Sequence, residues 1–328
     1  MRLLAAGDHF VLNSLFRQEL QGYDLEIGEL TLPWPVEPFG RVAEVREASG
    51  TEEQLIEALR GAEICVTQMA PLTERVLDAS PDLRLFCVGR GGPVNANLRA
   101  AAERGVRVTF APGRNATATA EHTVAMILAA IRRIPQTHAE LRQGVWRSDY
   151  YRFDAVGPEL EGGTVGLVGY GAIGRKVARV LEGFGAHVLV HDPYVPERSV
   201  PLDELLARSG IVTLHARATP GNHGMIGARE LDLMPAGSVL VNCARGSLVD
   251  YDAVCDALER GHLFAAAFDV FPEEPVPAGS RLLTTGGVVM TPHLAGASRQ
   301  TAQKAARIVA AEVGRYVRGE PLLHLANG

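Results

Sequence analysis

The stretch Thr164–Asp192, TVGLVGYGAIGRKVARVLEGFGAHVLVHD, holds the pattern from which the fold of this chain can be predicted. A short run of Val and Leu comes first, and Gly169, Gly171 and Gly174 follow it in the spacing G-x-G-x-x-G. Apolar residues at helical spacing come next, and a second Val-rich run ends in Asp192, about 20 residues after the glycines. A strand, a tight turn, a helix and a strand in this order predict a βαβ unit with parallel strands.

The three glycines have separate physical tasks in such a unit. The first makes the tight turn, the second lets the backbone approach a ligand, and the third lets helix and strand pack closely. Free N–H groups at the helix N-terminus attract an anion, so the turn predicts a site for the pyrophosphate of a dinucleotide. Asp192 can bind both ribose hydroxyls and repels a 2′-phosphate, which favours NAD over NADP. Arg198 leaves NADP open, and an ordinary glycine-rich turn is the alternative interpretation.

Similar patterns extend to both sides of this stretch. Apolar strand patterns occur at RLLAA, ICVTQ, LRLFCVG and VRVTF in the first third, and at TVGLVG, AHVLVHD, IVTLH, SVLVNCA, FAAAFDV and GVVMTPH in the second half. Helical patterns separate most of them, including one at about 116–134, which Pro135 is expected to end or kink, and one at about 298–318. This alternation builds parallel sheets covered on both faces. A chain of 328 residues is therefore expected to form two α/β domains.

Composition and charge argue against several classes of protein. Hydrophobic residues make up 47% of the chain and charged residues 21%, which is usual for a globular protein. A net charge of −6 predicts no nucleic-acid partner, and the longest apolar run, Val124–Ile131, predicts no membrane span. The N-terminus reaches Asp8 before the core of a signal peptide could form. The four cysteines contain no CxxC pair, so we expect no metal site and a cytoplasmic location.

Three chemically active side chains follow strand patterns of the second half. Arg245 comes after SVLVNCA, and Gly246 beside it is expected to let a ligand come close. Glu274 follows FAAAFDV, and His293 follows GVVM. Because the carboxyl ends of parallel strands meet at one edge of a sheet, we expect these residues near the bound dinucleotide. Each has a plainer alternative: a structural ion pair for Arg245, a structural role for His293, and Glu273 as the working acid instead of Glu274.

This set of side chains suits hydride transfer on a small anionic substrate. A nicotinamide supplies or takes the hydride, so the protein has to handle one proton and one negative charge. His293 can exchange the hydroxyl proton near neutral pH, and a neighbouring Glu274 carboxylate favours its protonated form. Arg245 can bind a carboxylate through its fork of donors and polarise a ketone oxygen.

In these motifs the chain resembles the D-isomer-specific 2-hydroxyacid dehydrogenase family, which includes phosphoglycerate, glyoxylate/hydroxypyruvate and D-lactate dehydrogenases. GLVGYGAIGRKVA, VNCARGSLVD, AAAFDVFPEEP and TPHLAGAS resemble the family's signatures and occur in its order. The resemblance implies an NAD-dependent enzyme that interconverts a D-2-hydroxyacid and its 2-oxoacid. It assigns His293 as the acid/base, Glu274 as its partner and Arg245 as the residue that binds the substrate carboxylate.

The resemblance also implies how the domains are connected. A Rossmann NAD-binding domain, residues 113–296, is inserted into a flavodoxin-like substrate domain, residues 1–112 and 297–328, and both are doubly wound parallel sheets. Members of the family close the two domains on the substrate, which expels water before transfer. The family is usually dimeric through the NAD-binding domain, so we expect a homodimer. The chain is expected to lack the C-terminal regulatory module that many phosphoglycerate enzymes carry.

Contacts to the cofactor follow from the same resemblance. Asp269 resembles the family's aspartate at the nicotinamide carboxamide, whereas His122 and His215 are expected to have structural rather than catalytic roles. The expected cofactor-binding residues are Gly169, Tyr170, Gly171, Ala172, Ile173, Gly174, Asp192, His215, Cys243, Ala244, Asp269 and Gly296.

The stretch CVGRGGPVNANL resembles the family's substrate loop. Backbone N–H groups of Gly91 and Gly92 would hold the substrate carboxylate, and Arg90 would supply an extra anion contact. Many relatives have an acid in a G-x-D-N pattern here, whereas this chain has Pro93-Val94-Asn95. This difference leaves the identity of the 2-hydroxyacid open.

Two alternatives to this enzyme stay open. The first is an NADH-binding regulatory or corepressor protein on the same scaffold, because some relatives of that kind keep the three site residues. The second is oxidation of formate or phosphite, although a Glu274–His293 pair is more useful for a hydroxyl proton. The aromatic segment Trp146–Phe153 is a further candidate site, expected to reach the substrate cleft or the dimer partner.

Overall fold

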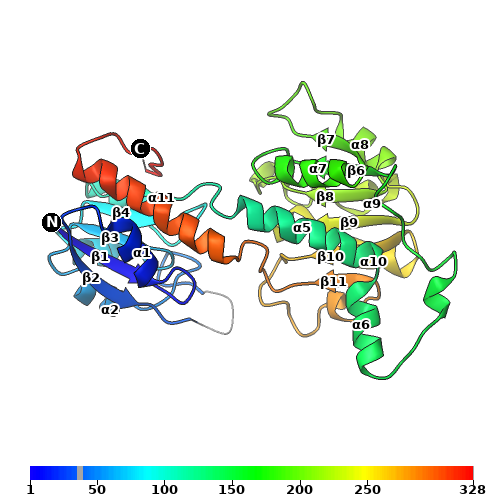
Figure 1. Cartoon of the computed structure of the whole chain (residues 1–328), viewed down its shortest axis with the longest axis horizontal. Coiled ribbons are helices and arrows are strands. Elements are labelled where there is room, and N and C mark those ends of the chain that lie inside the picture. The colour runs from blue at the N-terminus through cyan, green and yellow to red at the C-terminus, as the bar shows by residue number, and fades with distance from the viewer. Residues whose placement is uncertain (35–39, 328) are drawn as a thin grey trace. The chain divides into compact units, whose positions relative to one another are not determined.

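The computed structural model describes residues 1–34 and 40–327, and it divides the chain into two compact units (Figure 1). Unit 1 comprises Met1–Asn115 and Ala297–Gly328, and unit 2 comprises Ala116–Gly296. Unit 2 thus interrupts unit 1 in the sequence. None of the helices in the described part of the chain combines the length and the apolar character that crossing a membrane requires.

Unit 1 contains a parallel sheet of five strands in the order β2-β1-β3-β4-β5. This is the flavodoxin-like strand order. Four of the strands coincide with the predicted apolar runs, whereas β2 was not predicted. It lies at the edge of the sheet and is only partly buried, so its sequence, EIGELT, lacks an apolar run. The strands are β1 (Arg2–Gly7), β2 (Glu26–Thr31), β3 (Ile64–Thr67), β4 (Leu85–Val88) and β5 (Arg107–Thr109).

Helices cover both faces of this sheet because alternate residues of the strands are apolar on each side. Leu4 and Ala6 of β1 pack with residues of α2, α3 and α4, and Leu3 and Ala5 pack with residues of α1 and α11. The last helix begins at its Ser298 cap and agrees with the prediction for residues 298–318. The helices are α1 (Asn13–Leu20), α2 (Glu52–Ala58), α3 (Glu74–Asp78), α4 (Leu98–Glu103) and α11 (Arg299–Val317).

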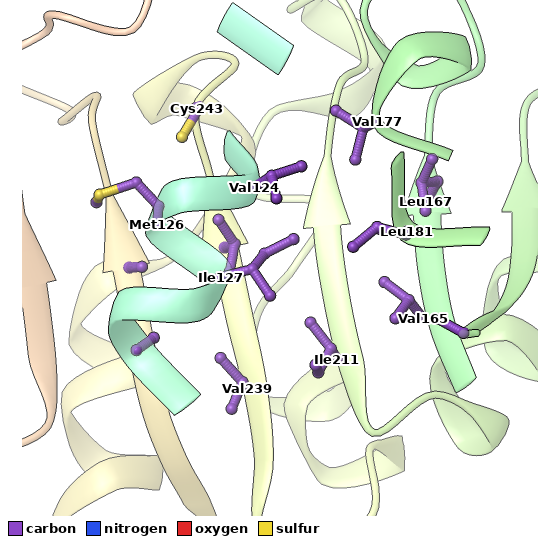
Figure 2. Close-up of a cluster of buried hydrophobic side chains, with 14 of the residues drawn as sticks. Val124, Met126, Ile127, Val165, Leu167, Val177, Leu181, Ile211, Val239 and Cys243 are labelled. Atoms are coloured by element: carbon purple, nitrogen blue, oxygen red, sulfur yellow. The ribbon is translucent and has the colours of Figure 1, made fainter. Parts of the chain in front are cut away.

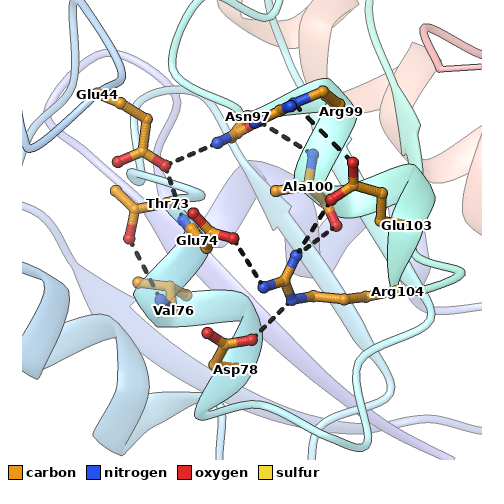
Figure 3. A network of polar contacts seen from close by, with 10 residues as sticks. All are labelled: Glu44, Thr73, Glu74, Val76, Asp78, Asn97, Arg99, Ala100, Glu103 and Arg104. Atoms are coloured by element: carbon orange, nitrogen blue, oxygen red, sulfur yellow. Dashed lines mark hydrogen bonds and ion pairs between the residues drawn. The ribbon is translucent and has the colours of Figure 1, made fainter.

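Polar contacts fasten α3 and α4 to each other (Figure 3). The Arg104 guanidinium contacts Asp78 at 2.7 Å and Glu74 at 3.0 Å. Asn97 caps α4 through the N–H of Ala100, and its amide nitrogen donates to Glu44 at 2.9 Å. These contacts hold α4 in place, and with it the C-terminal end of the loop that connects β4 to α4.

Unit 2 contains a parallel sheet of six strands in the order β11-β10-β9-β8-β6-β7. All six coincide with the predicted apolar runs. The chain turns from β6 to β7 on one side and returns to β8 on the other side of β6, which is the kind of switch point where α/β sheets bind ligands. The strands are β6 (Thr164–Val168), β7 (His187–His191), β8 (Ile211–Leu214), β9 (Ser238–Asn242), β10 (Leu263–Phe268) and β11 (Val288–Met290).

Two hydrophobic clusters hold the helices of unit 2 against this sheet. In the first, Val124 and Ile127 of α5 lie over Val239 of β9 and Ile211 of β8, and Val177 of α7 lies beside them (Figure 2). The second cluster packs α8, α9 and α10 on the opposite face. The helices are α5 (Ala116–Ile131), α6 (Ile134–Arg142), α7 (Gly174–Gly183), α8 (Leu202–Arg208), α9 (Ala228–Leu233) and α10 (Tyr251–Glu259).

The predicted helix at residues 116–134 is α5, which ends three residues earlier than predicted, and a second helix follows it at once. α5 ends at Ile131, Arg133 adopts the left-handed conformation with φ of 51°, and α6 starts at Ile134. Pro135 lies in the first turn of α6, where its missing N–H breaks no helical hydrogen bond. The proline therefore starts a new helix and does not kink the old one.

Candidate active site

The turn between β6 and α7 has the geometry that its glycines predict. Gly169 has a φ of 100°, and a Cβ there would lie 2.7 Å from the backbone N of Ala216. A Cβ at Gly174 would lie 2.3 Å from the Gly169 carbonyl oxygen, whereas a Cβ at Gly171 would meet no atom of the described chain within 4 Å. Gly169 and Gly174 thus allow close packing inside the protein, and Gly171 faces open space at the N-terminus of α7. This arrangement fits the pyrophosphate of a dinucleotide.

The carboxylate of Asp192 is held next to this turn. It is 9% exposed, and its Oδ2 accepts a hydrogen bond of 2.7 Å from the N–H of Tyr170. Oδ1 accepts one of 2.9 Å from the N–H of Tyr194. Because a carboxylate oxygen can accept more than one hydrogen bond, Asp192 can orient the turn and still bind ribose hydroxyls.

Two arginines flank the ring of Tyr170. The Cζ atom of Arg198 is 4.8 Å and that of Arg175 is 5.0 Å from the ring centroid. Arg198 also donates a hydrogen bond of 2.9 Å to Glu182. Glu182 therefore already offsets the positive charge of Arg198, the residue that kept NADP possible as the cofactor.

Glu274 and His293 form a hydrogen-bonded pair. Nδ1 of His293 lies 2.7 Å from Oε2 of Glu274, and Oε1 of Glu274 accepts a hydrogen bond of 3.0 Å from the N–H of Phe271. Of the two acids that the sequence offered, Glu274 is thus the one that contacts the histidine. The Nε2 atom of His293 remains the nitrogen that can exchange a proton with a substrate.

The pKa of His293 is raised above its usual value. The hydrogen bond to Glu274 is the largest cause, and burial opposes it. The charges of Glu274 and Asp269 raise this pKa further, whereas the charge of Arg245 lowers it. Arg245 therefore lies within electrostatic reach of His293.

Arg245 stands at the end of β9 with its side chain exposed. Its Nη1 donates to the carbonyl of Ala244 at 2.6 Å, and its own carbonyl accepts from Nδ2 of Asn242 at 2.9 Å. Within residues 1–34 and 40–327, its guanidinium makes no ion pair, so the structural alternative for Arg245 has no support. The charge is free to bind an anion.

Gly246 has a different task from the predicted one. A Cβ at this position would lie 2.1 Å from the carbonyl carbon and oxygen of Phe271. The neighbour that comes close is therefore the backbone that follows β10, and no ligand is needed to explain this glycine. The contact joins the segment that carries Arg245 to the segment that carries Glu274.

Asp269 is fully buried, and its carboxylate binds the segment that carries His293. Oδ1 accepts from Thr291 Oγ1 at 2.6 Å and from the N–H of Leu294 at 2.8 Å, and Oδ2 accepts from the N–H of Ala295 at 2.8 Å. His122 lies next to both side chains: its Nε2 is 3.0 Å from Thr291 Oγ1 and 3.5 Å from Asp269 Oδ1. Sequence reasoning missed Thr291, and its only signal was the position two residues before His293.

Two other expected cofactor contacts have altered acidity. Burial lowers the pKa of His215 to about 4, so its ring is neutral, and its Nε2 lies 3.3 Å from Thr213 Oγ1. Burial raises the pKa of Cys243 to about 12, so it stays a thiol. Neither group suits acid/base or nucleophilic chemistry near neutral pH.

The expected substrate loop belongs to unit 1 and follows β4. Nη1 of Arg90 donates to the carbonyl of Glu47 at 3.1 Å, and its Nη2 pairs with the Glu47 carboxylate. A Cβ at Gly91 or Gly92 would meet no described atom within 4 Å. Asn95, which matches the last position of the G-x-D-N pattern, is buried and anchors the loop, since its amide donates to the carbonyl of Ala70 at 2.8 Å. Val94, which stands in place of the acid, is exposed.

The order of motifs and the geometry of unit 2 agree with comparisons to known proteins. The family model described as "D-isomer specific 2-hydroxyacid dehydrogenase, NAD binding domain" matches residues 124–295. A crystal structure of TT0316 protein from Thermus thermophilus superimposes with a TM-score of 0.81 at 30% identity, covering 99% of this chain and all of that one.

Two curated relatives extend the likeness to most of the chain. The D-3-phosphoglycerate dehydrogenase of Methanocaldococcus jannaschii is 38% identical over 298 residues, 87% of this chain and 56% of the relative. The glyoxylate reductase of Korarchaeum cryptofilum is 34% identical over 86% of this chain and 87% of its own length. The chain therefore spans little more than half of the phosphoglycerate enzyme but most of the reductase. It belongs to the D-isomer-specific 2-hydroxyacid dehydrogenase family, and unit 2 is an NAD-binding domain of that family.

Proposed function

We propose that this protein is an NAD-dependent oxidoreductase that interconverts a D-2-hydroxyacid and its 2-oxoacid. One observation carries the proposal: the 2.7 Å contact between His293 and Glu274, with Arg245 in electrostatic reach of the imidazole. A histidine whose pKa is raised by a carboxylate is suited to deliver a proton to a ketone oxygen. No observation favours a regulatory protein or formate and phosphite chemistry.

The chemistry divides between the cofactor and three side chains. When bound, the nicotinamide exchanges a hydride with C2 of the substrate. During reduction, Nε2 of His293 gives its proton to the oxygen on C2, and Glu274 stabilises the protonated ring beforehand. Arg245 binds the substrate carboxylate and stabilises negative charge on the ketone oxygen. In the reverse direction, neutral His293 takes the hydroxyl proton.

The cofactor contacts proposed here rest on the turn after β6. Gly171 and the neighbouring residues 170–174 would hold the pyrophosphate, and Asp192 would bind the adenosine ribose, which favours NAD over NADP. Asp269, which fixes the backbone of Leu294 and Ala295, would act at the nicotinamide side. The remaining proposed contacts come from the ends of the next strands and are His215, Cys243, Ala244 and Gly296.

Unit 1 is proposed to be the substrate domain, with boundaries at 1–112 and 297–328. Its loop at Arg90, Gly91 and Gly92 would bind the carboxylate of a small 2-hydroxyacid or 2-oxoacid. The exposed positions of Gly91 and Gly92 support this, because backbone N–H groups can approach an anion where no Cβ is present.

A homodimer through unit 2 and a cytoplasmic location complete the proposal. The segment 134–156 exposes large apolar side chains, among them Trp146, Tyr151 and Phe153, which are 83%, 93% and 97% exposed. Exposed apolar groups of this density are typical of protein interfaces. The four cysteines are free and buried in the described chain, which suits a reducing compartment.

A turnover screen tests the proposed activity. A panel of 2-oxoacids is offered with NADH and, separately, with NADPH, and oxidation of the nicotinamide is followed. We expect turnover of at least one acid, and a loss of about 10²- to 10⁴-fold in kcat/KM for His293→Ala, because general acid catalysis contributes about that much. Tight NADH binding without turnover of any acid would contradict the proposal and favour a regulatory protein.

A further inference from the structure

The carboxyl edge of the sheet in unit 1 gathers four polar side chains from neighbouring strands. Asp8 follows β1, Gln68 follows β3, Arg90 follows β4, and Arg114 follows β5. Ligands of open parallel sheets bind at this edge, outside the carboxyl ends of the strands. Arg114 has no role in the function proposed above, and it differs from the other three in the surroundings of its charge.

Arg114 is a partly buried cation that makes no ion pair with any acid in the part of the chain that the structure describes. Its Nη1 donates a long hydrogen bond of 3.3 Å to Gln68, and its Cζ lies 5.9 Å from the centroid of the Phe10 ring. Its Nε is buried and has no hydrogen-bond partner among the residues that the structure describes. Burial is the largest cause that lowers the pKa of Arg114 to about 10; the charge of Arg90 also lowers it, and the charge of Asp8 raises it. A buried charge in this state destabilises a protein unless a ligand offsets it.

The neighbouring groups leave room for such a ligand. The Glu47 carboxylate offsets the charge of Arg90, and no described acid lies within ion-pair distance of Arg114. Asp8 accepts hydrogen bonds of 2.7 Å from the N–H groups of Phe10 and Val11 through Oδ1, while its Oδ2 is buried without a partner. Burial raises the pKa of Asp8, whereas the charge of Arg114 lowers it, so the two groups lie within electrostatic reach of each other without forming an ion pair.

We propose that Arg114, with Gln68 beside it and Arg90 in electrostatic reach, binds an anionic group of the substrate other than the carboxylate next to the reacting carbon. This assignment rests on the function proposed above, in which Arg245 takes that first carboxylate. It narrows the substrate class to 2-hydroxyacids and 2-oxoacids that carry a second anion, either a carboxylate or a phosphate. Both are oxyanions that accept the parallel N–H donors of a guanidinium.

The substrate class is tested with three oxoacids of similar length. 2-Oxobutyrate has one anionic group, 2-oxosuccinate adds a carboxylate, and 3-phosphooxypyruvate adds a phosphate. We expect wild-type kcat/KM to be higher for one of the two doubly anionic acids than for 2-oxobutyrate, and the better acid identifies the anion. Arg114→Gln should reduce this ratio roughly 10- to 100-fold, the value of a hydrogen bond to a charged group.

Control variants separate binding from a structural role. Arg99→Gln removes an arginine of the same unit whose side chain is 83% exposed, and it should leave the ratio at the wild-type value. Arg114→Lys should keep part of the preference because it retains the charge. Without ligand, Arg114→Gln should unfold at the wild-type temperature or above it, since it removes an unpaired buried charge. A lower unfolding temperature, or an equal loss of kcat/KM for all three acids, would overturn the assignment.

A binding measurement keeps this test apart from the test of the enzyme activity. Succinate and inorganic phosphate are added separately to the protein, and thermal unfolding is recorded. At least one of them should stabilise the wild type, Arg99→Gln and His293→Ala by a similar amount and Arg114→Gln by less, because the other proposed anion sites are unchanged in all four proteins except for the loss of Arg114. If the 2-oxoacid screen fails while this stabilisation is found, the anion site stands and the proposed activity falls. If neither anion stabilises the wild type, the anion site is wrong whatever the enzyme turns over.

Discussion

At the residue scale, the chemistry of the site depends on how one imidazole is held. Oε2 of Glu274 contacts Nδ1 of His293, and the second oxygen of the same carboxylate is fixed by the N–H of Phe271. His293 itself has a φ of 53°, an uncommon conformation for a residue with a side chain. Asp269 accepts hydrogen bonds from the side-chain hydroxyl of Thr291, before this histidine, and from the backbone N–H of Leu294, after it. The ring is therefore positioned by hydrogen bonds before any substrate arrives.

Replacing Glu274 by Gln tests this arrangement through the pH dependence of the reaction. In the proposed mechanism, reduction needs protonated His293, so its kcat/KM is expected to fall as the pH rises through the pKa of this residue. The substitution removes the carboxylate that raises the pKa. We therefore expect the alkaline limb of the profile to move to lower pH, with kcat/KM near neutral pH reduced about 10-fold or more.

The measurement is the pH profile of kcat/KM for a 2-oxoacid with NADH, and Glu273→Gln is the matched control. An unshifted limb in Glu274→Gln, or an equal shift in both variants, would contradict the assignment of Glu274.

The raised pKa of His293 also makes the stability of the protein depend on pH. A raised pKa in the folded state stabilises the protein below the unfolded pKa of the histidine, and this contribution disappears as the pH rises through the folded value.

At the scale of secondary-structure elements, glycines decide how closely neighbouring segments approach. The turn from β6 to α7 needs Gly174 because a Cβ there would lie 2.3 Å from a backbone oxygen of the same turn. The ends of β9 and β10 need Gly246 for a similar contact with Phe271. Gly171 has no such neighbour in the described chain, so packing does not explain it.

Two alanine substitutions in one turn should therefore have different effects. Gly174→Ala forces backbone atoms apart, and we expect it to cost about 1–3 kcal/mol of unfolding free energy or more, as overpacking does. Gly171→Ala should change this free energy by about 0.5 kcal/mol or less, yet weaken NADH binding, because its methyl group would occupy the space proposed for the pyrophosphate. Denaturant unfolding and NADH titration measure the two effects. Unaltered NADH affinity in Gly171→Ala would contradict the proposed cofactor site.

At the scale of the whole molecule, unit 2 carries an apolar segment that its own core does not use. α6 buries none of its residues, and the chain continues through Trp146 and the short helix Asp149–Tyr151 to Phe153, away from the sheet (Figure 1). Exposed apolar groups on this scale favour association. A second copy of the chain is the partner proposed for them.

The double variant Trp146→Ala with Phe153→Ala tests this partner. Sedimentation velocity should show a dimer for the wild type and a larger monomer fraction for the double variant at the same concentration. The unfolding temperature of the double variant should also depend less on concentration than that of the wild type, because dimer dissociation accompanies unfolding in a smaller fraction of its molecules. Leu283→Ala, which removes a half-exposed apolar side chain elsewhere in unit 2, is the control. A wild-type monomer, or a double variant as dimeric as the wild type, would show that the segment is not the interface.

The sequence by itself determined the features that depend on neighbouring residues. These features each lie within a short stretch: the apolar runs of strands, the periodicity of helices, and the spacing of Gly169, Gly171 and Gly174. The six strands of unit 2 and the glycine turn between β6 and α7 could therefore be predicted. The edge strand β2 could not, because a half-exposed strand at the rim of a sheet has little apolar signal. Pro135 marked a helix boundary without saying whether a helix ended, bent or began there.

Only the tertiary structure decided which distant residues meet. The sequence offered two acids for His293, and folding brings Glu274 to 2.7 Å. It suggested a ligand beside Gly246, whereas the backbone of Phe271 takes that space. It contained no sign that Arg114 would form no ion pair with the acids of the described chain. The physical reason is common to all three: contacts, burial and unpaired charges are properties of distance in space, and local patterns in a chain do not encode the separation of residues that lie far apart in it.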